Sequence, residues 1–185
     1  MESKIESQDQ KNIVRWFVMS AYKQEKLAEE RLSREDGLEY YIAKHYVVRT
    51  YHGKKTKVQV PYIPNIIFVH ATQAEIVEFK ERNNFIRFVT WNKSTGKEYL
   101  IVPDKQMDDF IRVSSSEEES VKYYKPDEVN LKKGTRVRII GGIFDGVEGV
   151  FIKKGRAAQG NLFVMIDGFV GVSVNIAPDL IQVIK

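Results

Sequence analysis

The stretch Lys133–Val150 has the most distinctive residue pattern in the chain. Two short β-branched runs are joined there by a loop in which glycines surround one phenylalanine, Phe144; these are Gly142, Gly146 and Gly149. Glycine adopts positive φ where a side chain would clash, so the spacing predicts tight turns in a small β-barrel. The ring of Phe144 is expected to be partly exposed, with Ile143 beside it. A ring on a rigid loop loses little entropy on binding, which predicts noncovalent recognition.

Patterns for catalysis are missing from the sequence. It contains no P-loop, nucleophile elbow or dinucleotide fingerprint. Cysteine is absent, which excludes disulfides and thiolate metal sites. The three histidines, His45, His52 and His70, lack the spacing of a zinc site. We therefore expect no enzymatic activity, no metal and no cofactor.

Composition indicates a globular chain with a packed core. Of the 185 residues, 43% are hydrophobic and 29% are charged, and no apolar run approaches the roughly 18–20 residues that span a bilayer. The polar start, 1–12, has no apolar segment of the kind found in secretory signals and predicts a disordered tail. We expect a cytoplasmic protein that makes no membrane contact.

Charge is distributed unevenly along the chain, whose formal net charge is +4. Residues 1–112 carry +3 and residues 131–185 carry +4, whereas residues 113–130 carry −3. Modest positive charge favours approach to a polyanion but is weaker than a dedicated nucleic-acid clamp carries.

Hydrophobic periodicity predicts helices and strands in alternation, followed by strands alone. The expected elements, in order, are a strand at 13–19, a helix at 23–34 with Gly37 as its C-cap, strands over 39–60 with a hairpin tip at 51–55, a strand at 66–69 after two prolines, a helix at 73–82, strands at 85–91 and 98–102, and a helix at 103–113. This order predicts helices packed on a mostly antiparallel sheet. The acidic run at 114–130 predicts a linker, and 131–185 has the length of a five-stranded SH3-like barrel.

Three stretches together resemble the NusG family of transcription elongation factors. They are Trp16-Phe17-Val18, the segment 61–69, and the glycine-rich stretch around Phe144, which resembles a KOW motif. The resemblance implies an α+β fold with an NGN-like N-terminal α/β sandwich at 13–113, which binds RNA polymerase, and a C-terminal KOW domain at 131–185. Within the family, the hairpin 53–56, the pair Pro64-Asn65 and the segments 45–49 and 65–69 are most similar to the specialised RfaH and UpxY paralogues. Those paralogues imply antitermination on one long operon, such as capsular or surface polysaccharide genes.

The resemblance also implies where partners bind. An apolar surface on the strand with Ile63, Ile66 and Phe68 would dock on the clamp helices of RNA polymerase. Strand alternation puts Ile66 and Phe68 on one face. The alternative is that these side chains are core, since a sheet covered by helices buries one face and sometimes both.

Two basic groups are candidates for contact with upstream or non-template DNA. The first is the hairpin, with Arg49, Lys54, Lys55 and Lys57, and the second is the first helix, with Lys23, Lys26, Arg31 and Arg34. Lysine supplies charge whereas arginine can read base edges, so Arg31 is the residue suited to specificity. The alternative is an ordinary solvated surface; on the helix, i,i+4 pairs such as Lys26–Glu30 and Arg31–Glu35 favour that interpretation.

For the KOW loop, the resemblance implies that Ile143 and Phe144 contact a small-subunit ribosomal protein or the termination factor Rho. The alternative is that Phe144 plugs one end of the barrel. Two rival functions stay open: a general NusG factor that couples polymerase to Rho or the ribosome, and a KOW-type RNA-binding or ribosome-associated protein. In each case we expect a monomer.

Overall fold

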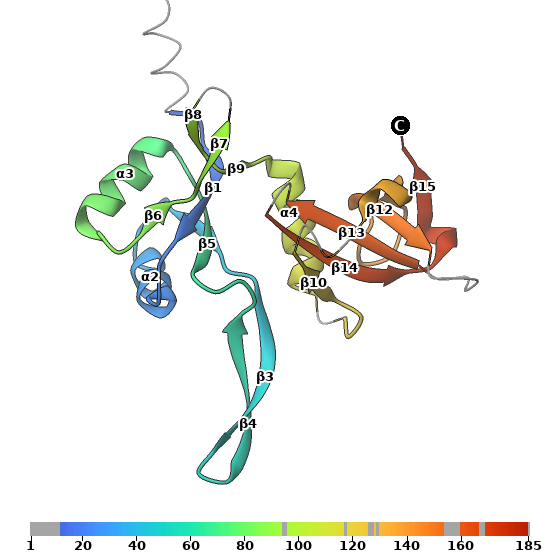
Figure 1. The fold of residues 1–185 in the computed structure, drawn as a ribbon, viewed down its shortest axis with the longest axis horizontal. Helices are drawn as coiled ribbons and strands as arrows, with labels where there is room; N and C mark the ends of the chain where they lie inside the picture. The colour runs from blue at the N-terminus through green and yellow to red at the C-terminus, as the bar shows by residue number, and fades with distance from the viewer. Residues whose placement is uncertain are drawn as a thin grey trace, which may run out of the picture. The chain divides into compact units, whose positions relative to one another are not determined.

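A computed structural model describes residues 12–93, 96–116, 118–125, 128, 130–153, 160–166 and 169–184. The chain forms two compact units, Met1–Pro103 and Asp104–Lys185 (Figure 1). Within the described ranges, no helix is long and apolar enough to cross a membrane.

The first unit is built on an antiparallel sheet with the strand order β2-β5-β1-β6, in which β9 also pairs with β1. Its strands are β1 (Arg15–Ser20), β2 (Glu39–Tyr41), β5 (Ile66–Ala71), β6 (Arg87–Phe88) and β9 (Ile101–Val102). The two central strands β1 and β5 pair along their whole length, from Arg15 opposite Ala71 to Ser20 opposite Ile66. They are also the most apolar, as expected of strands that have neighbours on both sides.

Two helices, α2 (Glu25–Leu32) and α3 (Gln73–Arg82), cover one face of this sheet (Figure 1). Their inward residues join every second residue of β1 and β5 in one core: Phe17, Met19, Ala28, Leu32, Ile67, Val69, Ile76 and Phe79. Thr72 begins α3 with a capping box, because its hydroxyl accepts from the Glu75 N–H while the Glu75 carboxylate accepts from the Thr72 N–H.

Two hairpins complete the first unit. One is long, β3 (Lys44–Tyr51) paired with β4 (Lys54–Pro61), and extends away from the sheet and helices (Figure 1). Its two-residue turn is His52-Gly53, with positive φ at both positions (48° and 79°), as a type I′ turn requires. The other is short, β7 (Thr90–Lys93) paired with β8 (Gly96–Tyr99).

The second unit contains the helix α4 (Asp104–Ser114) and an antiparallel sheet of six strands, ordered β10-β14-β13-β12-β11-β15. The strands are β10 (Lys122–Tyr124), β11 (Thr135–Ile139), β12 (Glu148–Lys153), β13 (Gly160–Ile166), β14 (Val170–Ile176) and β15 (Ile181–Val183). The helix packs against β13 and β14 and buries Met107, Phe110 and Val113.

The α+β fold class expected from the sequence is confirmed. The boundary between the two units differs from the one that we expected. We expected the first domain to run to residue 113, but α4 groups with the second unit, which begins at Asp104. Part of the segment expected to be a linker at 114–130 is strand β10, paired with β14. The expected tail at 1–12 lies outside the described residues except for Asn12.

Candidate functional site

The face of the first sheet opposite α2 and α3 carries the residues expected to bind polymerase. Val69 belongs to the core under the helices, so its neighbours in β5, Phe68 and His70, point to the other face. Their partners on β1, Val18 and Trp16, lie on the same face by register. Trp16, Phe68 and His70 therefore form an aromatic row on this face, in which Trp16 and Phe68 are buried and His70 is half-buried.

Two of the three expected polymerase-binding residues are accessible. Ile66 and Ile63 are half-buried, and the Ile66 N–H donates to the Ile63 carbonyl at 3.4 Å. Phe68 is fully buried, at 0% exposure. The structure thus agrees with the expected alternation, which puts Ile66 and Phe68 on one face, but leaves Phe68 no surface for a partner in this conformation.

A turn between β1 and α2 fixes the position of Ile66 by contacts that the sequence did not reveal. Asn65 has a positive φ of 67°, and its side-chain oxygen accepts from the Lys23 N–H at 2.7 Å. The Asn65 N–H donates to the Glu25 carboxylate at 2.8 Å, and the Asn65 carbonyl accepts from the Ala21 N–H at 2.8 Å. Asparagine tolerates positive φ better than most residues, which was the available signal.

The β3–β4 hairpin is basic and exposed. Residues 44–61 contain no Asp or Glu, whereas Lys44 and all four expected hairpin cations, Arg49, Lys54, Lys55 and Lys57, lie on its two strands. The four are exposed. Lys57 lies over the ring of Tyr46 at 4.3 Å, and Tyr46 and Val48 are 55% and 67% exposed. The hairpin therefore presents apolar and basic side chains together.

The four expected cations on and beside α2 are exposed: Lys26 and Arg31 lie on the helix, Lys23 precedes it and Arg34 follows it. They do not form one group. Arg34 pairs with Glu30 at 2.7 Å, and Glu35 pairs with Arg82 of α3 at 2.9 Å. The expected pairs Lys26–Glu30 and Arg31–Glu35 are wrong: the Glu30 and Glu35 carboxylates bind Arg34 and Arg82 instead. Within the described part of the chain, Lys26 and Arg31 make no ion pair. Lys23 has a φ of +56° and lies 5.1 Å from the ring of exposed Tyr22.

In the second unit the glycine-rich loop lies beside α4. Phe144 is only 6% exposed, so the expectation of a partly exposed ring is wrong, while Ile143 beside it is 61% exposed. Arg112 donates to the carbonyls of Ile143 at 3.2 Å and Asp145 at 2.6 Å. Arg112 thus anchors the loop backbone to α4, a helix that we expected to belong to the first domain.

A second set of contacts joins α4 to the end of this loop. Lys105 donates to the Gly146 carbonyl at 2.9 Å and to the buried carboxylate of Asp109 at 2.5 Å. Asp109 also accepts from the Glu148 N–H at 3.1 Å. The Arg138 guanidinium, which donates to Glu148, lowers the pKa of that carboxyl.

The described residues contain no group of three or more His, Cys, Asp or Glu that could hold a metal ion. The accessible candidates are apolar, aromatic and basic side chains. Such side chains bind proteins and nucleic acids by burial and charge.

Comparison with known proteins identifies one family that matches the chain. The family described as "Transcription termination factor nusG" matches residues 14–111, more than half of the chain. Among solved structures, the chain is similar to one titled "Domain interaction in Thermotoga maritima NusG", with 20% identity, a TM-score of 0.44, and coverage of 94% of this chain and 98% of that one. None of the curated proteins compared with the chain matches it. On the match over residues 14–111, the chain belongs to the NusG family of transcription elongation factors.

Proposed function

We propose that the protein binds RNA polymerase through the sheet face opposite α2 and α3 and promotes processive transcription, as an antitermination factor of the RfaH or UpxY kind. The observation that supports this most is the pair of half-buried isoleucines, Ile63 and Ile66, next to that face. Trp16, Val18 and Phe68 on the same face are buried and would contribute only after the side chains that cover them have moved. A helical partner such as the polymerase clamp helices needs an apolar surface with a few large anchors. A ligand that prefers the closed clamp would shift the polymerase toward that state and oppose pausing.

The basic hairpin extends this proposal to DNA. Its strands carry five Lys or Arg and no carboxylate over residues 44–61. Of the five, Lys44 pairs with Glu29 of α2, and the other four are exposed. Lysines on an exposed tip reach phosphates without reading sequence. On α2, exposed Arg31 makes no ion pair among the described residues and is the candidate for contact with a base edge.

The glycine-rich loop of the second unit supports a separate partner site, with Ile143 as its exposed anchor. Phe144 would contribute only after the loop has moved, because its ring is buried. We propose a protein partner here, either a small-subunit ribosomal protein or Rho.

Co-purification with core RNA polymerase at moderate salt tests the polymerase contact. The tagged wild type, Ile66→Glu and a matched control, Val183→Glu, would be compared after circular dichroism shows that all three are folded. Val183 is 67% exposed and lies on β15 of the second unit. We expect capture by the wild type and the control but not by Ile66→Glu. Equal capture by all three would reject this face as the interface.

Transcription of two templates by the captured complex separates a specialised factor from a general one. A specialised factor lengthens transcripts only on a template that carries the leader of its own operon. A general factor acts equally on an unrelated template, and that result would reject the antitermination proposal.

A further inference from the structure

The β3–β4 hairpin extends from the first unit with no buried residue of its own. Its two strands pair with each other in a two-stranded sheet, and every residue in them is half-buried or exposed. The hairpin begins after buried Ile42 and Ala43, and it is followed by Tyr62, whose N–H donates to the Ala43 carbonyl at 2.7 Å. The direction of the hairpin therefore depends on contacts at its base.

One ion pair joins this base to the helix α2. The ammonium of Lys44, the first residue of β3, lies 2.5 Å from the Glu29 carboxylate. The two side chains are 28% and 34% exposed, so salt and water screen this pair less than a fully exposed one. By comparison, the Arg34 and Glu30 side chains, which also pair, are 66% and 52% exposed. The Lys44–Glu29 pair can therefore restrain the first strand of the hairpin.

The preceding turn of α2 holds the segment that returns from the hairpin to the sheet. Glu25 lies four residues before Glu29, hence on the same side of the helix, and accepts from the Asn65 N–H at 2.8 Å. Asn65 directly precedes Ile66, the first residue of β5. One side of α2 thus contacts both connections between the hairpin and the sheet.

The helix α2 is itself fixed within the first unit. Ala28 and Leu32 belong to the core under the helices. Just after the helix, the Glu35 carboxylate accepts two hydrogen bonds from Arg82 of α3, at 2.9 and 3.2 Å. The base of the hairpin is therefore held by a helix that is anchored to the sheet and to α3.

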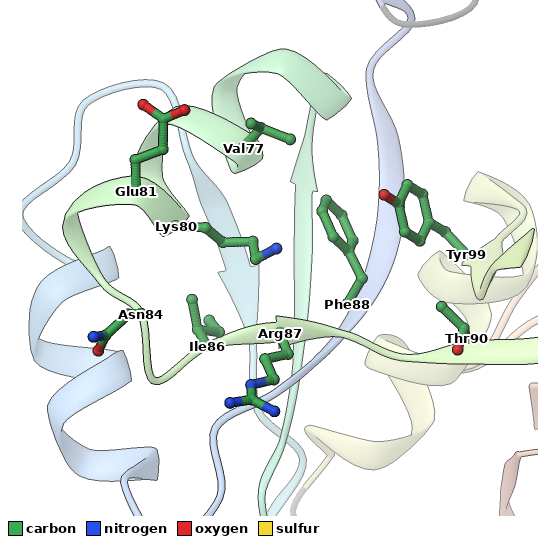
Figure 2. Close-up of a pocket in the computed structure, with 9 residues that line it drawn as sticks. All are labelled: Val77, Lys80, Glu81, Asn84, Ile86, Arg87, Phe88, Thr90 and Tyr99. Atoms are coloured by element: carbon green, nitrogen blue, oxygen red, sulfur yellow. The ribbon is translucent and has the colours of Figure 1, made fainter.

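A pocket of about 520 Å³ lies between α3 and β6 (Figure 2). In the described part of the chain its lining includes Lys80 and Tyr99 but no residue of α2 or of the hairpin. This space therefore does not interrupt the contacts that run from α3 through α2 to the hairpin.

We propose that Glu29 is a positioning residue, whose ion pair with Lys44 holds the β3–β4 hairpin at a fixed angle to the strand that begins at Ile66. Glu25 supports this angle by holding the turn at Asn65. This role rests on the proposed function, in which Ile66 contacts polymerase and the hairpin contacts DNA. With the angle fixed, the first contact presents the second at a raised effective concentration.

The length of the hairpin makes this angle important. Each of its strands has eight residues. Eight residues of strand extend about 26 Å, so a rotation of about 20° at the base moves the tip by about 9 Å. A hydrogen bond to a phosphate needs a heavy-atom distance of about 2.7–3.2 Å. A hairpin that swings freely would therefore bring Lys54 and Lys55 to their phosphates for only part of the time.

Double electron–electron resonance on the free protein measures the position of the hairpin. The chain contains no cysteine, so Thr50→Cys near the hairpin tip and Ala74→Cys on α3, both exposed positions, carry the two spin labels. We expect Glu29→Gln to broaden the distribution of label distances, because glutamine cannot form the ion pair. Lys44→Met should broaden it to the same extent, and combining the two changes should add nothing.

Two further proteins make this measurement decisive. The charge-swapped variant Glu29→Lys, Lys44→Glu should restore the narrow distribution. The control Glu30→Gln removes the ion pair with Arg34 on the same helix and should leave the distribution unchanged. An unchanged distribution in Glu29→Gln, or equal broadening in Glu30→Gln, would overturn the positioning role.

The affinity for a transcribing polymerase complex connects the angle to binding. We expect Glu29→Gln to bind about two- to fivefold more weakly, the range that the free energy of a partly exposed ion pair allows. In the variant Lys54→Gln, Lys55→Gln the same change should cause no further loss, since the contact that it aligns is already gone. Unchanged affinity of a Glu29→Gln protein whose label distances have broadened would overturn the positioning role.

The two measurements separate this role from the proposed function. Equal affinity of the wild type and of Lys54→Gln, Lys55→Gln would reject the DNA contact of the hairpin. The label distances are measured without polymerase or DNA, so they would still decide whether Glu29 fixes the angle of the hairpin.

Discussion

The indole of Trp16 and the imidazole of His70 stack face to face, with ring centroids 4.7 Å apart and planes inclined by 13°. They are register partners on β1 and β5. The His70 Nδ1 also lies 2.9 Å from a carboxylate oxygen of Glu39 on β2. Three strands are therefore joined on the face that we propose for polymerase.

We expect His70→Ala to lower the free energy of unfolding by about 1 kcal/mol, because stacked aromatic pairs contribute about 0.5–1.5 kcal/mol beyond burial. His70→Phe keeps a ring opposite Trp16 and should lose less. Urea denaturation of both variants measures the difference. Both variants remove the contact with Glu39, so an equal loss in the two would show that this contact, and not the stack, accounts for the effect.

Truncating Phe68 should damage the fold and not only a contact. Its ring is fully buried, so Phe68→Ala should cost about 3–5 kcal/mol of unfolding free energy. Val48 on the hairpin is 67% exposed, and Val48→Ala should change stability by less than about 0.5 kcal/mol. Thermal denaturation compares the two. A stable Phe68→Ala protein would mean that this ring is exposed in solution.

Gly149 and Gly142 should resist substitution for different reasons. A Cβ at Gly149, in β12, would lie 2.5 Å from the Phe163 carbonyl oxygen of β13, so Gly149→Ala must push two paired strands apart. Overpacking of this kind costs about 1–3 kcal/mol. A Cβ at Gly142 meets nothing within 4 Å, but its φ is +71°, which costs about 1–2 kcal/mol for alanine. Gly142→Asn should therefore recover stability in denaturation experiments, whereas Gly149→Asn should not.

The N-cap of α3 should make stability depend on pH. The hydrogen bond from the Thr72 hydroxyl lowers the pKa of Glu75 below its ordinary value of 4.5, so the ionised form stabilises the fold. This contribution is present above the unfolded-state pKa and is lost as the pH falls through the folded pKa.

Thr72→Ala should cost about 1 kcal/mol at neutral pH. The difference from wild type should shrink once the pH drops below the ordinary glutamate pKa of 4.5, where Glu75 becomes protonated in the unfolded chain. Urea denaturation at several pH values measures this. A penalty that does not change down to acidic pH would mean that the Glu75 carboxylate does not contribute.

Local patterns allowed most of the first unit to be predicted. The helix Gln73–Arg82 has the bounds that its periodicity indicated, and the turn at His52-Gly53 lies within the expected hairpin tip. Gly37 was wrongly expected to cap α2, which ends at Leu32 with Ser33 as its C-cap. Gly37 instead serves a later turn, at a φ of +91°.

The errors concern residues whose surroundings come from distant segments. We predicted that the loop around Phe144 is exposed. The loop sequence does not show that Arg112 of α4, some thirty residues earlier, donates to its carbonyls. The pocket beside Lys80 was missed for the same reason, since Tyr99 reaches it from β8. Gly149 was assigned to a turn, yet it lies in a strand and is needed for the approach of β13.

The carboxylate-free β3–β4 hairpin has a consequence for the solubility of the protein. It is a two-stranded ribbon with exposed Tyr46, Val48 and Tyr51, and such ribbons can pair edge to edge between copies. Lys44 pairs with Glu29, but repulsion between Arg49, Lys54, Lys55 and Lys57 opposes edge-to-edge pairing. Salt weakens this repulsion, since the Debye length is about 10 Å at 0.1 M. The same lysines that would draw the hairpin to a phosphate backbone therefore also keep copies of the protein apart, and concentrated salt should promote self-association.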